Sequence, residues 1–230
     1  MAEDTKYTMI EMSKFMLSTC RRHAHAAHLT DDTDTVLDSN MSILFLAPSV
    51  IEATFNEFVS ISSIFEDRGE ETNELFDLLK KKEREPLYKR WNKLSSHLGG
   101  TEWNKEEEPF CYIYDIKNIR NGLVHFKGDF LPNGEAPSKD IERFLRESCA
   151  PVYNDCPWTA AIISHPDMAL WAYETTLNLC FKMPKLLNAE DFQYFEKMKY
   201  TLQEELVTHL DGMDLIMSDQ PHMKERKFKE

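Results

Sequence analysis

The sequence is poor in glycine and proline, the two residues that most often interrupt helices. They contribute 7 and 10 of the 230 residues, whereas together they average about 12% of protein sequences. Valine is also scarce, with 6 residues against 23 leucines and 11 methionines. Unbranched apolar side chains lose less rotamer freedom in a helix than β-branched ones do. We therefore predict an all-α protein built from long, uninterrupted helices.

Long apolar runs are absent as well. One of the longest, ILFLA at residues 43–47, is bounded by Ser42 and Pro48, and it is far shorter than the ~18 residues that a membrane helix needs. The first residues, MAEDTKYT, are polar and lack the positively charged start and apolar stretch of a secretory signal. We expect a soluble, cytoplasmic protein with no membrane partner.

Cysteine pairs and nucleotide-binding motifs are missing too. The five cysteines are far apart and include no Cys-x-x-Cys pair, which argues against a disulfide framework or a zinc ribbon and favours reduced, mostly buried thiols. The chain contains no P-loop, Gly-x-Gly-x-x-Gly or Gly-x-Ser-x-Gly motif. We therefore predict no cofactor.

Positive charge is in the minority, because 27 basic residues face 40 acidic ones and the net charge is -13. This balance argues against a protein that coats nucleic acid with a generally basic surface. A local site is still compatible with it. One stretch gathers basic residues that form either a solvated helix face or a path for a phosphate backbone: Lys80, Lys81, Lys82, Lys89, Arg90 and Lys93.

Hydrophobic periodicity and capping signals divide the chain into helices and loops. We assign residues 1–150 to a helical bundle, 151–218 to a helical extension packed on it, and 219–230 to a charged tail. The Asp- and Thr-rich residues 30–40 are predicted to be a loop, and residues 151–166 to be irregular. The predicted helices cover residues 6–29, 42 to about 63, 71–82, 86–97, 110–126, 138–148, 167–182 and 189–210.

The predicted helix 110–126 carries one residue of the wrong kind for its position. On a helical wheel, Ile113, Ile116, Leu123 and Val124 define an apolar arc, and Arg120 falls inside that arc. An arginine is almost never fully buried unless its charge is compensated. We therefore expect Arg120 to meet a carboxylate, a phosphate or an interface.

The same helix places Tyr114, Asn121 and His125 on one face, the last two at the i, i+4 spacing that brings side chains together. Gly122 lies beside them. A glycine inside a helix costs ~1 kcal/mol relative to alanine, and its usual reason is the close approach of another backbone. A second helix, from this chain or from a second copy, is expected to pack there.

These residues spell the hexapeptide RNGLVH, Arg120-Asn121-Gly122-Leu123-Val124-His125. At this point the sequence resembles the HEPN family, whose signature is an arginine, often followed by asparagine, with a histidine four to six residues later on a helix of an α-bundle. The upstream segment EPLYKRWNKLSSHLGG resembles the basic helix and loop that precede the motif in some members. The segment LAPSVIEATFNEF resembles their second helix, where Glu52 matches a polar position that faces the motif. The resemblance covers residues 6–130.

The resemblance implies a metal-independent endoribonuclease, as in many toxins and anti-phage defence effectors. In this chemistry, His125 would transfer protons and Arg120 would hold phosphate oxygens in a fork, while Asn121 orients the histidine or binds phosphate. Tyr114 and Glu52 would support the site, and the basic stretch would contact the RNA substrate. One motif supplies one histidine, so the family implies a homodimer that pairs two motifs.

One position departs from the pattern of the minimal toxins, in which a tyrosine that an antitoxin can modify follows the histidine by two residues. Lys127 stands here, and it could add a phosphate contact. The relation to that antitoxin is therefore not carried over, and a different antitoxin or regulator remains open as a partner.

Alternatives without catalysis remain open. Arg120 could be the buried ion-pair partner of Glu52 and His125 a helix-end residue, as in a non-catalytic module that binds RNA or dimerises. His25 and His28 are close enough on a helix to share a metal, but no further ligand pattern supports them, and we predict no metal site. Three aromatic residues could stack on bases but are more typical of a core: Trp158, Trp171 and Tyr173.

Overall fold

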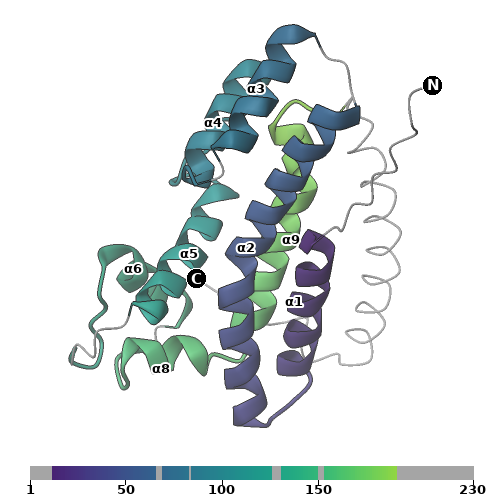
Figure 1. Ribbon diagram of the computed structural model, residues 1–230. Coiled ribbons are helices and arrows are strands. Elements are labelled where there is room, and N and C mark those ends of the chain that lie inside the picture. The colour runs from purple at the N-terminus through teal and green to yellow at the C-terminus, as the bar shows by residue number, and fades with distance from the viewer. Residues whose placement is uncertain (1–11, 66–68, 83, 126–130, 150–152, 191–230) are drawn as a thin grey trace.

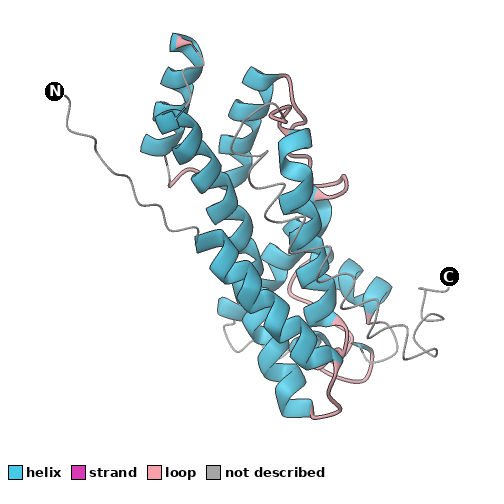
Figure 2. Ribbon diagram, turned by 90° about the vertical axis from the view of Figure 1, so that its right-hand side faces the viewer, coloured by secondary structure: helices cyan, strands magenta, loops and turns pink. Residues whose placement is uncertain are grey.

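The structure, a computed structural model, describes residues 12–65, 69–82, 84–125, 131–149 and 153–190. These residues form eight helices and no strand (Figures 1 and 2), which confirms the all-α prediction. The helices are α1 (Met12–His28), α2 (Thr33–Phe65), α3 (Glu70–Lys81), α4 (Leu87–Leu98), α5 (Phe110–Val124), α6 (Lys139–Ser148), α8 (Trp158–Ile163) and α9 (Met168–Leu186).

The core is organised around α2, the longest helix, which packs against α1 and α9, and these two also contact each other (Figure 1). Its apolar residues recur at steps of three and four, which places them on one face, and Ala47, Ile51, Phe55 and Phe58 of that face are fully buried. Burying such side chains contributes roughly 1.5–3 kcal/mol each. The long central helix therefore fixes the position of every element that packs on it, α5 included.

The prediction of a loop over residues 30–40 was wrong, because α2 already begins at Thr33. The carboxylate of Asp32 accepts a hydrogen bond from the backbone N–H of Thr35 at 3.0 Å, which caps the helix. Asn40, about two helical turns after Thr33, is fully buried. Its amide donates to the carbonyls of Ile163 and His165 and accepts from the N–H of Ala169, all at 2.8 Å. Polar residues here cap the helix and bind the start of α9 rather than forming a loop.

Helices α3 and α4 cover one end of α2 (Figure 1), and both match their predicted ranges. Pro86 precedes the first turn of α4, and Gly99 ends it in the left-handed conformation at φ 70°. At Gly100 a Cβ would lie 2.6 Å from the carbonyl oxygen of Leu186. Only glycine fits there, which lets the end of α4 reach the end of α9.

At the other end of the bundle, α5 runs along α2 toward α6 and α8 (Figure 1). Ser138 caps α6, which matches the predicted helix 138–148, and its hydroxyl accepts from the N–H of Ile141 at 3.3 Å. The prediction that residues 151–166 are irregular was wrong over α8, which buries Trp158 and Ile162. A six-residue helix is too short to show a clear period, and its stability comes from this burial.

The core continues across residue 150, since α8 and α9 contribute to the same buried cluster as α1, α2 and α5. The predicted helix 189–210 and tail 219–230 lie almost wholly outside the described residues, as does Lys127. Among the described helices, α2 has one 30-residue stretch, Thr33–Ser62, that is long and apolar enough to cross a membrane. A core helix passes the same test, and 44% of the apolar window is buried inside the protein.

Candidate functional site

The RNGLVH motif occupies the last turn of α5 and the residue after it. Arg120 is partly buried, and its Nη1 donates a hydrogen bond to Oδ1 of Asn121 at 2.8 Å. His125 follows α5 as its C-cap and is exposed, with its backbone N–H bonded to the carbonyl of Asn121 at 2.9 Å. The motif therefore presents a guanidinium and an imidazole at the solvent-facing end of one helix.

Asn121 contacts the arginine of the motif rather than the histidine. In the described part of the chain, no hydrogen bond joins the side chains of Asn121 and His125. The Asn121 amide instead holds the guanidinium, which has no carboxylate partner of its own among these residues. Because a guanidinium has five N–H donors, Arg120 keeps donors that can meet an anion.

The buried Arg120–Glu52 ion pair considered as an alternative is wrong. Glu52 is exposed on α2, and no ion pair connects it to Arg120 among the residues that the structure describes. Arg120 belongs to the apolar arc of the helical wheel because it lies on the side of α5 that faces α2. At Arg120, however, the space between α5 and α2 is open. Arg120 is compensated by Asn121 and by solvent.

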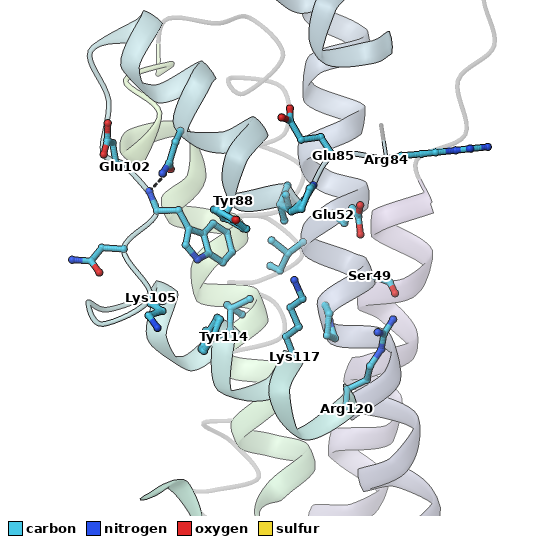
Figure 3. Close-up of a pocket in the computed structure, with 18 residues that line it drawn as sticks. Ser49, Glu52, Arg84, Glu85, Tyr88, Glu102, Lys105, Tyr114, Lys117 and Arg120 are labelled. Atoms are coloured by element: carbon cyan, nitrogen blue, oxygen red, sulfur yellow. Dashed lines mark hydrogen bonds between the residues drawn. The ribbon is translucent and has the colours of Figure 1, made fainter. Parts of the chain in front are cut away.

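That open space is a groove of about 990 Å³ bounded by α2, α4 and α5, which we call the α5 groove. Its walls come from residues 48–52 of α2, residues 84–92 at the start of α4, the segment 102–105, and α5 from Ile113 to Arg120. Figure 3 shows Lys117 pointing into it and Arg120 pointing toward α2, with Glu52 across from them. Arg120 thus links the motif to a large recess.

Aromatic and charged side chains line this groove together. Tyr114, predicted as a supporting residue, is one of them, and Nζ of Lys105 lies 5.5 Å from the centre of its ring. Tyr88 also lines the groove and is 44% exposed. The sequence reasoning missed Tyr88, Lys105 and Lys117. The i, i+3 spacing of Tyr114, Lys117 and Arg120 on one helical face was the signal that could have identified Lys117.

The predicted basic stretch is divided by the fold. Arg90 is only 1% exposed, and its guanidinium carbon lies 5.3 Å from the centre of the Phe55 ring. Its assignment as an RNA-binding candidate is therefore wrong, because no ligand in solvent reaches it. Lys93 is partly buried and bonded to Glu85 at 2.7 Å. The remaining candidates lie outside the α5 groove, at the end of α3 and on α4: Lys80, Lys81, Lys82 and Lys89.

Gly122 does make room for a close neighbour, but that neighbour belongs to the same chain. A Cβ there would lie 3.0 Å from Cη2 of Trp158 and 3.2 Å from Cδ1 of Ile141. Helices of this chain therefore do pack at Gly122, as one of the two expectations had it, although they approach with side chains rather than with their backbones. The small residue instead admits the side chains of α6 and α8, which hold the C-terminal half of α5 in place.

Polar contacts to α6, the helix that also contacts Gly122, hold α5 in place as well. Asp115 is 8% exposed and accepts from Nη2 of Arg143 at 3.3 Å, and Asn118 donates to Asp140 at 3.4 Å. Burial raises the pKa of Asp115 to about 6, although the charge of Arg143 acts in the opposite direction. These groups fasten α5 to α6 on the face opposite the α5 groove.

The other sequence candidates fall outside this site. Trp158 and Tyr173 are 3% and 5% exposed, which confirms the core interpretation, and Trp171 packs on Phe144 with ring centres 4.8 Å apart. His25 and His28 end α1. Across the described ranges, no three histidine, cysteine or acidic side chains come together as a metal site would need.

A comparison of the chain with protein-family models, curated proteins and solved structures finds no match.

Proposed function

We propose that the protein is a metal-independent endoribonuclease of HEPN type that acts through Arg120, Asn121 and His125. The observation that carries the proposal is the arrangement at the end of α5. There, the guanidinium of Arg120 is held by Asn121 at the mouth of a large groove, and an exposed imidazole follows five residues later. Both groups are accessible to a phosphate and neither is used to stabilise the core.

The chemistry follows from the properties of these two side chains. The imidazole of His125 removes the proton from a ribose 2′-OH, whose oxygen then attacks the neighbouring phosphorus. The new 2′-O–P bond replaces the P–O5′ bond, which leaves a 2′,3′-cyclic phosphate and a free 5′-OH. The guanidinium of Arg120 stabilises the negative charge that develops on the phosphate oxygens. Asn121 fixes the guanidinium in place, so less side-chain entropy is lost when RNA binds.

The leaving 5′-oxygen needs a proton donor, and one motif contains one histidine. The proposal therefore includes a homodimer in which His125 of a second copy protonates that oxygen. The second copy meets the exposed end of α5, where Val124 is 47% exposed, rather than Gly122. Multi-angle light scattering at micromolar concentration measures this directly, and a strictly monomeric protein that still cleaves RNA would contradict the two-histidine scheme.

The test of function uses the purified full-length chain and a mixed RNA in the presence of EDTA. His125→Ala is expected to lower the cleavage rate by ~100-fold or more. His25→Ala is the matched control, since this exposed histidine ends α1 away from the groove, and it should cleave at the wild-type rate. Thermal unfolding of both variants separates a loss of chemistry from a loss of fold. If folded His125→Ala cleaves like the wild type, the catalytic assignment is wrong and the protein is a binding module.

Arg120→Lys provides a second and independent probe. It keeps the positive charge but loses the planar fork that holds two phosphate oxygens. Because Arg120 has no buried carboxylate partner in the described residues, its replacement should cost little stability. A large loss of cleavage rate with an unchanged melting temperature is the expected result.

A further inference from the structure

The α5 groove extends well beyond the residues that the proposed chemistry requires. Its volume of about 990 Å³ is at the upper end of the roughly 300–1,000 Å³ usual for ligand sites. Arg120 lies at one end of it, and Lys117, Tyr114 and Tyr88 lie farther along (Figure 3). A polymer bound at Arg120 would therefore have room to continue along the groove past Lys117 and Tyr114.

The charge of the groove is opposite to that of the protein as a whole. Glu85 is neutralised by Lys93 at 2.7 Å, and Arg84 extends away from the groove (Figure 3). Three cations, Lys105, Lys117 and Arg120, then remain against two carboxylates, Glu52 and Glu102. In a chain of net charge -13, this local excess of positive charge favours a polyanion at this place and disfavours it elsewhere.

The aromatic residues of the groove supply flat, accessible rings. Tyr88 is 44% exposed, and the ring of Tyr114 is partly exposed beside Nζ of Lys105. Trp103 forms a fixed wall, because its backbone N–H donates to Oδ1 of Asn92 at 2.6 Å and the centre of its ring lies 4.7 Å from that of Phe110. Aromatic rings that alternate with cations along a groove are the arrangement on which unpaired bases stack and their phosphates are neutralised.

We propose that the α5 groove binds the unpaired nucleotides next to the phosphate held by Arg120, so that the substrate is single-stranded RNA. Lys117 holds an adjacent phosphate, because it lies one helical turn from Arg120 on the same face. Tyr88 and Tyr114 stack on the bases. Paired bases in a duplex cannot reach these rings. The inference rests on the proposed ribonuclease function and specifies its substrate.

Binding is measured separately from cleavage by using an RNA in which 2′-O-methyl groups replace the 2′-hydroxyls. Fluorescence anisotropy of this uncleavable, dye-labelled single strand gives the Kd of the wild type and of each variant. Tyr88→Ala and Tyr114→Ala should each weaken binding by ~5-fold or more. The matched control is Tyr112→Ala, which removes a tyrosine of α5 that is 37% exposed and lies outside the groove.

Lys117→Ala is the variant least able to disturb the fold, since Lys117 is exposed. It should weaken binding and reduce the slope of log K against log salt by ~0.7, the value for one phosphate contact on a single strand. Lys139→Ala, an exposed lysine at the start of α6, should change neither quantity. A duplex of the same sequence should bind at least ~10-fold more weakly than the single strand.

Three results would overturn the inference: groove variants that bind like their controls, a duplex that binds as tightly as the single strand, or a mononucleotide that competes as well as the RNA. The proposed function fails in a different way. If the groove variants lose binding as expected but unmodified RNA stays intact with the wild type, the groove binds RNA and the catalytic assignment is wrong.

Discussion

Replacing Gly122 with alanine tests whether α5 is positioned by its own chain. In a helix with free space around it, this change stabilises the protein by ~1 kcal/mol, because alanine is the better helix former. Here the new Cβ would lie 3.0 Å from Cη2 of Trp158 and 3.2 Å from Cδ1 of Ile141. Both side chains are buried, and overpacking of this kind costs about 1–3 kcal/mol.

The two effects leave a net loss of up to about 2 kcal/mol for Gly122→Ala. For a chain of this size, that corresponds to a melting temperature lowered by up to about 8 °C. Gly122→Leu should lose more, because its larger side chain cannot fit between α6 and α8 without moving one of them. Both variants are measured by thermal and urea unfolding at low concentration, where a contribution from dimerisation is smallest.

A second substitution shows whether the crowding is the cause. Ile141→Val removes Cδ1, the atom that the new Cβ would meet at 3.2 Å, and by itself should cost about 0.5–1.5 kcal/mol. The double variant, Gly122→Ala with Ile141→Val, should lose less stability than the sum of the two single variants. The crowding is only partly relieved, because the new Cβ still meets Trp158. A Gly122→Ala variant more stable than the wild type, or strictly additive changes, would refute the intrachain contact.

Further predictions concern three other polar residues. Because burial raises the pKa of Asp115 to about 6 from a usual value near 3.9, the folded protein holds a proton there that the unfolded chain releases. The free energy of unfolding therefore falls by up to about 3 kcal/mol as the pH rises from about 4 to 6, and urea titrations should show this fall in the wild type but not in Asp115→Asn. Asn40→Ala leaves three backbone groups without their partner, the buried N–H of Ala169 and the partly buried carbonyls of Ile163 and His165, and should lower the free energy of unfolding by about 3 kcal/mol; a loss below about 1 kcal/mol in urea unfolding would contradict this role. Glu52→Gln removes a carboxylate from the α5 groove and should tighten RNA binding about twofold at low salt; weaker binding in the anisotropy assay would contradict the polyanion interpretation.

Periodicity predicts which face of a helix is buried, and it succeeded over the middle of α2, whereas Val124 of the predicted apolar arc of α5 is 47% exposed. The apolar face of α2 from Ala47 to Phe58, the range of α3 and the glycine end of α4 follow from this pattern and from capping chemistry. The same reasoning failed at residues 30–40, because aspartate and threonine favour both loops and helix N-termini. Only the distant partners of Asn40 in the α8–α9 connection decide between these two structures.

The candidate site was predictable as a motif but not as a surface. The sequence brings Arg120, Asn121 and His125 together within six residues, and the structure places them at the exposed end of α5. The groove beside them depends on how α2, α4 and α5 diverge, which no local pattern specifies. For the same reason a count of charges along the chain included Arg90, which the fold buries against Phe55, and missed Lys105 and Lys117.

The chemistry of the cleaved RNA ends tests the central claim most directly. The wild-type protein is incubated in EDTA with an RNA of defined sequence, and the products are analysed by mass spectrometry. Attack by the 2′-oxygen, with His125 as the base, predicts 2′,3′-cyclic phosphates and 5′-hydroxyls, which should disappear with His125→Ala and persist with His25→Ala. Products with 5′-phosphates and 3′-hydroxyls, or cleavage that requires a divalent metal, would contradict the account.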